Sequence, residues 1–436
     1  MLSSSVAISL RFAFALGAAA ASWGLIRYVS KHPHAPRHDT VLVGAYAASR
    51  LGLWLIFALF LQRHVTDSDP RLFYVPMLDH FLAGQIPIRD FFYPYGPLLV
   101  PAMIPFYLVF GRGLAGISLF AITAELIALV FFVKAARKTM DPQWARAAGA
   151  LYLLNPATLY WTVLHGYNGI VQTAYSMAGL YCLIRGRSAL GYAAGLLGAA
   201  GARLVAALDW PALLAVRRPA AGALLLGALP LVAVYAVFQL VSGNILFPVT
   251  WHADLASEGT LWFLLVMFLP PGSFRDYLIA PNALPMILFA ALFVPGFAAW
   301  ARAVRSGRAA FSFPAALGLS TYAVALFLIC SRYAASYYIP ILMLPASVVV
   351  MQPGGRWPWS RAALLFVSAL AVPSDAIWMA IGRSQTVDPG PWFFGPAPQQ
   401  AVVLLWKGAL FLKLAACGAL AWLGLRLALG EPGAAC

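Results

Sequence analysis

Two carboxylates open the stretch of this chain that is richest in groups able to do chemistry. Asp67 and Asp69 directly follow an apolar segment and lead into Phe73 and Tyr74. Aromatic side chains and lipid exclude water from a carboxylate, which raises its pKa and makes it a better base toward a hydroxyl group. Two carboxylates could also hold a divalent cation through oxygen, but one Asp-x-Asp is a weak metal signal. We therefore expect a general base here and no metal.

Other polar and aromatic side chains recur in short connecting segments. Tyr93 and Tyr95 lie in the run Tyr93-Pro-Tyr-Gly-Pro97, and His165 and Asn168 flank Gly166 in a short turn. The turn residues either bond to a sugar hydroxyl or a phosphate, or are solvated at the membrane surface, as a histidine at an interface often is. Both readings stay open from the residues alone.

Basic residues supply the candidates for holding a phosphate. Arg275 and Arg332 lie in segments where arginine is otherwise sparse, and Arg203 interrupts an apolar stretch. A planar guanidinium suits bidentate binding of a phosphate. His252 and Glu258 occupy a further loop, where they either bind acceptor hydroxyls or are simply solvated.

The composition identifies the protein class that must position these residues. Of the 436 residues, 62% are hydrophobic and only 10% are charged, which is typical of a polytopic membrane protein. The formal charge of +15 comes mainly from short connectors, as the positive-inside rule produces, so we expect no nucleic-acid partner. The four cysteines lie far apart and predict neither a metal site nor a disulfide.

The hydropathy pattern predicts one all-α membrane domain over residues 1–436, with about 11 spans. A span needs roughly 20 apolar residues. The predicted spans are 6–26, 41–62, 115–134, 147–164, 170–184, 219–241, 284–301, 311–330, 338–352, 361–380 and 401–426. With the basic connectors in the cytoplasm, the loops at 67–97, 165–169, 242–283, 331–337 and 381–400 all face outside.

Three apolar stretches do not fit as ordinary spans. Residues 97–111 contain three prolines, and 260–269 end at a Pro-Pro pair, so we expect short helices at the outer surface there. Residues 189–216 have arginines on both sides, which predicts two half-helices that enter from the cytoplasm and return.

As an ordered set, several motifs resemble glycosyltransferases of the GT-C type. These are Asp69-x-x-x-Phe-Tyr74, Leu82-Ala-Gly-x-x-Pro87, Tyr93-Pro-Tyr-Gly-Pro97, Asn155-Pro156, His165-Gly-Tyr-Asn168 and Tyr337-Tyr338 with Pro345. The chain is most similar in them to bacterial α-mannosyltransferases that depend on polyprenol-phosphate-mannose. The likeness covers residues 41–345, and residues 346–436 would add C-terminal spans.

The resemblance implies that Asp69 is the catalytic base. The chain departs from the family pattern at two positions. The family often has a His before a Tyr where this chain has Tyr337-Tyr338, and usually a Lys where this chain has Arg203. We expect the substrate to be bound by Asp67, Tyr74, Tyr93, Tyr95, His165, Asn168, Arg203, His252, Glu258, Arg275, Arg332 and Tyr337.

The resulting expectation is an inverting transferase without cofactor or metal. Its partners would be a polyprenyl-phosphate sugar donor, a glycan or glycolipid acceptor and membrane lipids, at the outer face of a bacterial inner membrane. A ligase or polymerase of lipid-linked glycans is one alternative. A secondary transporter with broken helices is another, and a non-catalytic scaffold is a third, although it leaves 67–97 unexplained.

Overall fold

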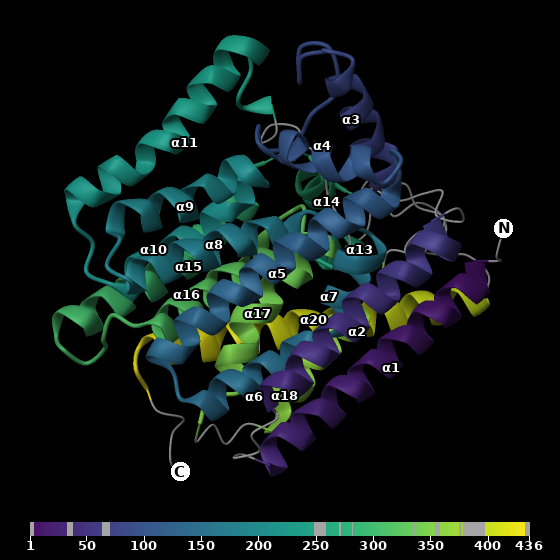
Figure 1. Ribbon diagram of the computed structural model, residues 1–436. Coiled ribbons are helices and arrows are strands. Elements are labelled where there is room, and N and C mark those ends of the chain that lie inside the picture. Colours follow the sequence, from purple (N-terminus) through teal and green to yellow (C-terminus); the bar gives the residue numbers. More distant parts are fainter. Residues whose placement is uncertain are drawn as a thin grey trace.

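The computed structural model in Figure 1 describes residues 4–32, 38–62, 70–247, 259–269, 272–280, 282–334, 336–353, 358–374, 377 and 397–431. In these ranges all regular elements are helices and there is no strand, so the predicted all-α class is confirmed. The first half contains α1 (Ser4–Lys31), α2 (His38–Ile56), η1 (Phe57–Leu61), η3 (Pro70–Tyr74), α3 (Val75–Leu82), α4 (Leu99–Val109), α5 (Leu114–Thr139), α6 (Pro142–Leu153), α7 (Pro156–Thr158), η4 (Leu159–Leu164), α8 (Gly169–Ile184), α9 (Ser188–Gly201), η5 (Leu204–Asp209) and α10 (Trp210–Val216). The second half contains α11 (Ala221–Ser242), α13 (Leu261–Phe268), α14 (Ser273–Ile279), α15 (Leu284–Arg305), α16 (Phe313–Cys330), η6 (Ser336–Tyr338), α17 (Ile339–Val350), α18 (Pro358–Leu370) and α20 (Ala397–Ala428).

Seven helices in the described part of the chain are long and apolar enough to cross a membrane. They are Ile8–Lys31, Asp39–Leu61, Leu114–Thr139, Ala221–Ser242, Leu284–Arg305, Phe313–Cys330 and Leu404–Ala428. Each coincides with one of the eleven predicted spans. The other four predicted spans are shorter or broken, so the count of eleven remains a prediction.

Local sequence explains one of these breaks. The side chain of Asn155 accepts hydrogen bonds from the N–H groups of Ala157 and Thr158, and Pro156 occupies the first helical position. Such a cap ends the preceding helix and begins a new one. The predicted span 147–164 is therefore divided between α6, α7 and η4.

The apolar surface of the bundle is distributed as in a protein surrounded by lipid. Nearly all of α16 and all of α17 are buried, so these two helices form the centre. By contrast, α1 and α2 lie along one side of the molecule in Figure 1 and α11 along the opposite side, and large apolar side chains such as Leu16, Leu55 and Leu240 are exposed on them. Exposed apolar patches of this extent mark a surface that is covered in its native setting.

The two half-helices predicted for residues 189–216 are present as a helical hairpin of α9 and α10. A Cβ on Gly195 would lie 2.6 Å from the Leu213 side chain, and a Cβ on Gly198 would lie 3.4 Å from Ala206. The later residue of the first segment, Gly198, thus lies beside the earlier residue of the second, Ala206. The two segments therefore run antiparallel. The chain reverses at Ala202 and at Arg203, whose backbone is extended. Arg203 therefore lies at the tip of the hairpin.

The bundle has two ends that differ in the residues found there. At the arginine-rich end, Asp39 at the start of α2 contacts Arg137 of α5 at 3.5 Å and Arg146 of α6 at 3.2 Å. The N–H of Ser312 before α16 donates to the carbonyl of Ala215 in α10 there. The tip of the α9–α10 hairpin lies at the other end, which we call the loop end.

Short helices are also present in the two stretches, 97–111 and 260–269, for which the sequence predicts them. α4 has 11 residues and α13 has 8. At about 1.5 Å per residue, neither is long enough for a hydrocarbon core of about 30 Å. This agrees with their placement outside the set of spanning helices.

Candidate functional site: a buried arginine in a tyrosine cage

Arg203 is the centre of the candidate site. Only 7% of its surface is exposed, and its Nη1 donates to the hydroxyl of Tyr338 at 2.6 Å. Among the described residues it makes no ion pair with a carboxylate, and its Nε has no hydrogen-bond partner. A buried guanidinium without a counter-charge is costly to desolvate, and an anionic ligand at this position would supply the missing charge.

Four tyrosine rings surround this guanidinium. Its Cζ lies 4.5 Å from the ring centroid of Tyr95, 5.2 Å from Tyr167, 5.9 Å from Tyr337 and 5.5 Å from Tyr338. We call these four rings the tyrosine cage. Cation–π attraction offsets part of the desolvation of Arg203 and fixes the guanidinium in place.

Residues from distant segments complete the cage. The ring of Tyr74 in η3 packs edge-on against Tyr95 at 5.1 Å, and the rings of Tyr167 and Tyr337 lie 4.3 Å apart. The predicted residues Tyr74, Tyr95, Arg203 and Tyr337 are thus brought together. They come from four parts of the chain that the sequence alone does not connect.

The Tyr93–Pro97 segment reaches Arg203 because it docks on the last turn of α9. The N–H groups of Gly96 and Leu98 donate to the carbonyls of Ala202 and Ala200, both at 2.9 Å. Carbonyls at the end of a helix lack partners within it, so these bonds satisfy them. Docking places Tyr95 over the guanidinium.

Gly96 allows this close approach, and we expect Gly96→Ala to disrupt it. An added Cβ would lie 2.3 Å from the carbonyl oxygen of Ala200, so backbone must move. Overpacking of this kind destabilises by about 1–3 kcal/mol. The measurement is thermal unfolding in detergent. Gly149→Ala, where nothing lies within 4 Å of the new Cβ, is the matched control. Equal melting temperatures of the two variants would contradict the docking argument.

Tyr93 stabilises the loop in which it lies. It is fully buried, its hydroxyl donates to the carbonyl of Gly96 at 2.7 Å, and the N–H of Val100 approaches the same hydroxyl at 3.4 Å. Its ring packs edge-on against Tyr95 at 6.1 Å. Tyr93 therefore holds the turn that presents Tyr95, rather than pointing a free hydroxyl into the site.

Several polar atoms beside the cage have no partner among the residues that the structure describes. They are the hydroxyl of Tyr167, both amide atoms of Asn168 and the hydroxyl of Ser336. Asn168 is fully buried and Ser336 is 1% exposed. Buried polar groups are nearly always hydrogen-bonded, so these atoms are available to a polar ligand. Asn168, a predicted binding residue, thus adjoins the cage through Tyr167.

His165 lies next to this site in a dense aromatic group. Its ring is 4.6 Å from Tyr160 and 4.9 Å from Trp161, and Trp161 is 5.9 Å from Tyr337. Burial, with a smaller contribution from the charge of Arg11, lowers the pKa of His165 to about 3. The imidazole is therefore neutral at pH 7, and can donate or accept a hydrogen bond without adding charge.

Arg332 contacts the segment that carries Arg275. Arg332 is 8% exposed, and its Nη1 donates to the carbonyl of Ala280, just after α14, at 2.7 Å. Arg275 lies within α14 and is partly buried. Arg332 thus links the loop before the cage residues Tyr337 and Tyr338 to α14, while Arg203 is the arginine that the cage surrounds.

Four predicted residues, Asp67, Asp69, His252 and Glu258, lie outside the described residues. The described chain resumes at Pro70, the first residue of η3, and Tyr74 is the last residue of the same helix. Within the described ranges, no three His, Cys, Asp or Glu side chains lie together in a way that could hold a metal ion.

Sequence reasoning missed two cage residues and one buried acid. Tyr167 and Tyr338 lie inside motifs that the sequence singled out, but were not selected as site residues. Asp209 ends η5 and accepts hydrogen bonds from Ser320 at 2.6 Å, Ser176 at 2.8 Å and Gln172 at 3.1 Å. It anchors the hairpin segment after Arg203 to α8 and α16. An aspartate within an apolar stretch was the available signal.

No model of a protein family matches the chain, and no curated protein matches it.

Proposed function

We propose that this protein is an integral-membrane inverting glycosyltransferase. It moves a sugar, with mannose as the expected one, from a polyprenyl-phosphate donor to a glycan or glycolipid acceptor. The loop end would face the outer side of a bacterial inner membrane, because the basic connectors gather at the opposite end.

One observation carries the proposal. Residues of the glycosyltransferase-like motifs, namely Tyr95, Tyr167 and Tyr337, meet around the buried Arg203, although 242 positions separate the first from the last. An unrelated set of aromatic side chains would have no reason to converge on one buried cation. The convergence supports a single site for an anionic, partly apolar substrate.

The chemistry follows from the charge of each group. Arg203 would bind the donor phosphate, and the tyrosine rings would pack against the sugar and the first isoprene unit. Asp69 would take the proton of the acceptor hydroxyl as its oxygen bonds to the anomeric carbon. The bond from that carbon to the donor oxygen breaks, and the electron pair leaves with the phosphate. Attack from the opposite face inverts the anomeric centre.

The direct test is transfer by the purified protein from a polyprenyl-phosphate sugar, with and without Asp69→Asn. We expect the variant to lower kcat/KM more than about tenfold, because the amide keeps the shape but cannot accept the proton. Asp90→Asn is the matched control. The guanidinium of Arg89 and the N–H of Ile86 hydrogen-bond to Asp90 and hold the pKa of its carboxyl below the usual range, which makes it a poor base.

Three outcomes would test the proposed activity and the role of Asp69. Transfer by wild type that Asp69→Asn loses and Asp90→Asn keeps is the expected result. If the Asp69→Asn variant retains transfer, Asp69 is not the catalytic base. No transfer from any polyprenyl-phosphate sugar, with folded protein, would reject the function.

The second candidate function is secondary transport. Broken helices with ionisable residues at the break are typical of transporters, and the hairpin carries Arg203 and Asp209 near its turn. Counterflow of a labelled solute into proteoliposomes, without sugar transfer, would favour this alternative.

A further inference from the structure

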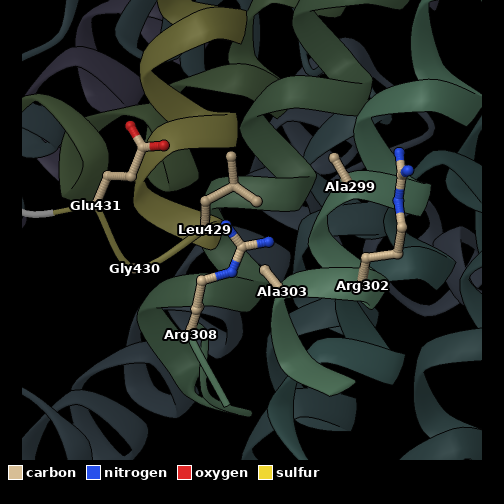
Figure 2. A pocket seen from close by; sticks show the side chains of 7 residues that line it. All are labelled: Ala299, Arg302, Ala303, Arg308, Leu429, Gly430 and Glu431. Atoms are coloured by element: carbon tan, nitrogen blue, oxygen red, sulfur yellow. The ribbon is translucent and has the colours of Figure 1, made fainter. Parts of the chain in front are cut away.

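A surface pocket lies at the arginine-rich end of the bundle, opposite the tyrosine cage. It has a volume of about 450 Å³ and is formed where the end of α15 meets the end of α20. Its lining residues are Ala299, Arg302, Ala303, Arg308, Leu429, Gly430 and Glu431. Figure 2 shows Arg308 reaching up between Leu429 and Ala303, with Arg302 on the other side of Ala303.

The position of the C-terminal wall depends on close helix packing. A Cβ on Gly424 of α20 would lie 2.6 Å from the carbonyl oxygen of Gly318 in α16, so these backbones touch. A Cβ on Gly430 would lie 3.2 Å from the carbonyl oxygen of Arg308. The end of α20 is thus held against the connection between α15 and α16, and the pocket is part of the fold.

Both arginines of the pocket, Arg302 and Arg308, bond to neutral groups, so their charge is available to a ligand. The Nε of Arg302 donates to the carbonyl of Ala298 at 3.4 Å, and the Nε of Arg308 donates to the hydroxyl of Ser306 at 3.1 Å. Neither pairs with a carboxylate among the described residues.

The one acid of the pocket does not neutralise them. The carboxylate of Glu431 lies 2.9 Å from the Nε of Arg426, and in Figure 2 Glu431 stands at the margin opposite Arg302. The pocket is therefore net positive, with two guanidinium groups that face it from different segments.

The apolar surface beside the pocket indicates which kind of anion it would bind. α15 is one of the helices long enough to span a membrane, and Leu292 and Val294 on it are exposed. Arg302 bonds back toward Ala298, so its guanidinium lies along the apolar helix rather than beyond it. A phosphate bound there would have apolar helix surface beside it for acyl chains. Basic pockets between membrane helices bind phospholipid head groups in this way.

We propose that this pocket binds the head group of an anionic phospholipid, with its acyl chains along α15. Arg302 and Arg308 contact the phosphate from two sides. The lipid bridges the ends of α15 and α20.

The test uses the full-length protein in detergent micelles, with phosphatidylglycerol, phosphatidylcholine or inorganic phosphate added. We expect phosphatidylglycerol to raise the melting temperature more than the other two. The double variant Arg302→Gln/Arg308→Gln should bind phosphatidylglycerol at least about tenfold more weakly, because each loses a charge-assisted contact. Arg302→Lys/Arg308→Lys should fall between the two, because an ammonium lacks the bidentate fork.

Arg305→Gln is the matched control, since Arg305 lies on the same helix end but does not line the pocket. It should retain the stabilisation by phosphatidylglycerol. A loss equal to that of the double variant would mean a general charge effect and overturn the site. Equal stabilisation by inorganic phosphate would identify a free-phosphate site instead, and no stabilisation by phosphatidylglycerol would reject the proposal.

Discussion

Replacing Arg203 by methionine should lower kcat/KM for sugar transfer at least about 100-fold, because two charge-assisted contacts to a phosphate are each worth about 1.5–3 kcal/mol. The substitution keeps a long unbranched side chain and removes the charged guanidinium, together with its hydrogen bond to Tyr338. It is therefore a test of the cation and not of packing. Arg203→Lys should recover part of the loss, since its ammonium keeps the charge but cannot bind in a bidentate manner.

The stability of the same variant separates a binding role from a structural one. Arg203 is 7% exposed and makes one hydrogen bond and four ring contacts, with no carboxylate nearby among the described residues. Removing a buried charge that lacks a counter-ion relieves desolvation, so the ligand-free methionine variant should be no less stable than wild type. Unfolding at a clearly lower temperature would make Arg203 a structural anchor.

The matched control for Arg203 is Arg89→Met. Arg89 is exposed, and its Nε lies 2.9 Å from Asp90 in the loop that precedes Tyr93. Exposed ion pairs are worth about 0–1 kcal/mol, so this variant should keep both stability and transfer. Equal loss of transfer in the two variants would point to the general charge of the loop end rather than to the cage.

Composition and spacing predicted the helical class and several members of the site, but not their meeting. Tyr95 and Arg203 were singled out separately, one for its aromatic loop and the other for interrupting an apolar stretch. Their contact depends on the docking of Gly96 on the end of α9, which is a tertiary contact without a local signal. Long-range packing of this kind is not encoded in any window of sequence.

Hydropathy also does not reveal where a predicted span is divided into separate helices. A window averages over residues 147–164 and does not register that Asn155 caps a new helix at Pro156. Tyr93 illustrates a similar limit. A tyrosine in a loop looks available, and only the structure places its hydroxyl on the carbonyl of Gly96.

A buried ion pair that joins α2 to α5 leads to the second large prediction. The Nη2 and Nε of Arg50 lie 2.6 Å and 2.9 Å from the two carboxylate oxygens of Glu125, and neither side chain is exposed. Tyr152 donates to the same carboxylate at 2.8 Å, while Arg50 also donates to the carbonyl of Leu153. The pair thus connects α2, α5 and α6 around one bidentate contact.

Glu125→Ala should lower the free energy of unfolding by about 3–5 kcal/mol, because it leaves the guanidinium of Arg50 buried without its counter-charge. The double variant Arg50→Met/Glu125→Leu should recover most of this loss, since well-packed apolar residues can replace a buried pair at little cost. Unfolding in mixed micelles of detergent and dodecyl sulfate measures both. Asp39→Asn is the matched control, because the contacts of Asp39 with Arg137 and Arg146 lie at the surface, where such pairs are worth about 0–1 kcal/mol. If Glu125→Ala costs no more than Asp39→Asn, water or lipid reaches Arg50 in the native protein. The pair would then be a surface contact that adds little to the attachment of α2 to α5, which the hydrogen bonds from Tyr46 to the carbonyl of Ile122 and from Trp54 to the carbonyl of Ala115 would retain.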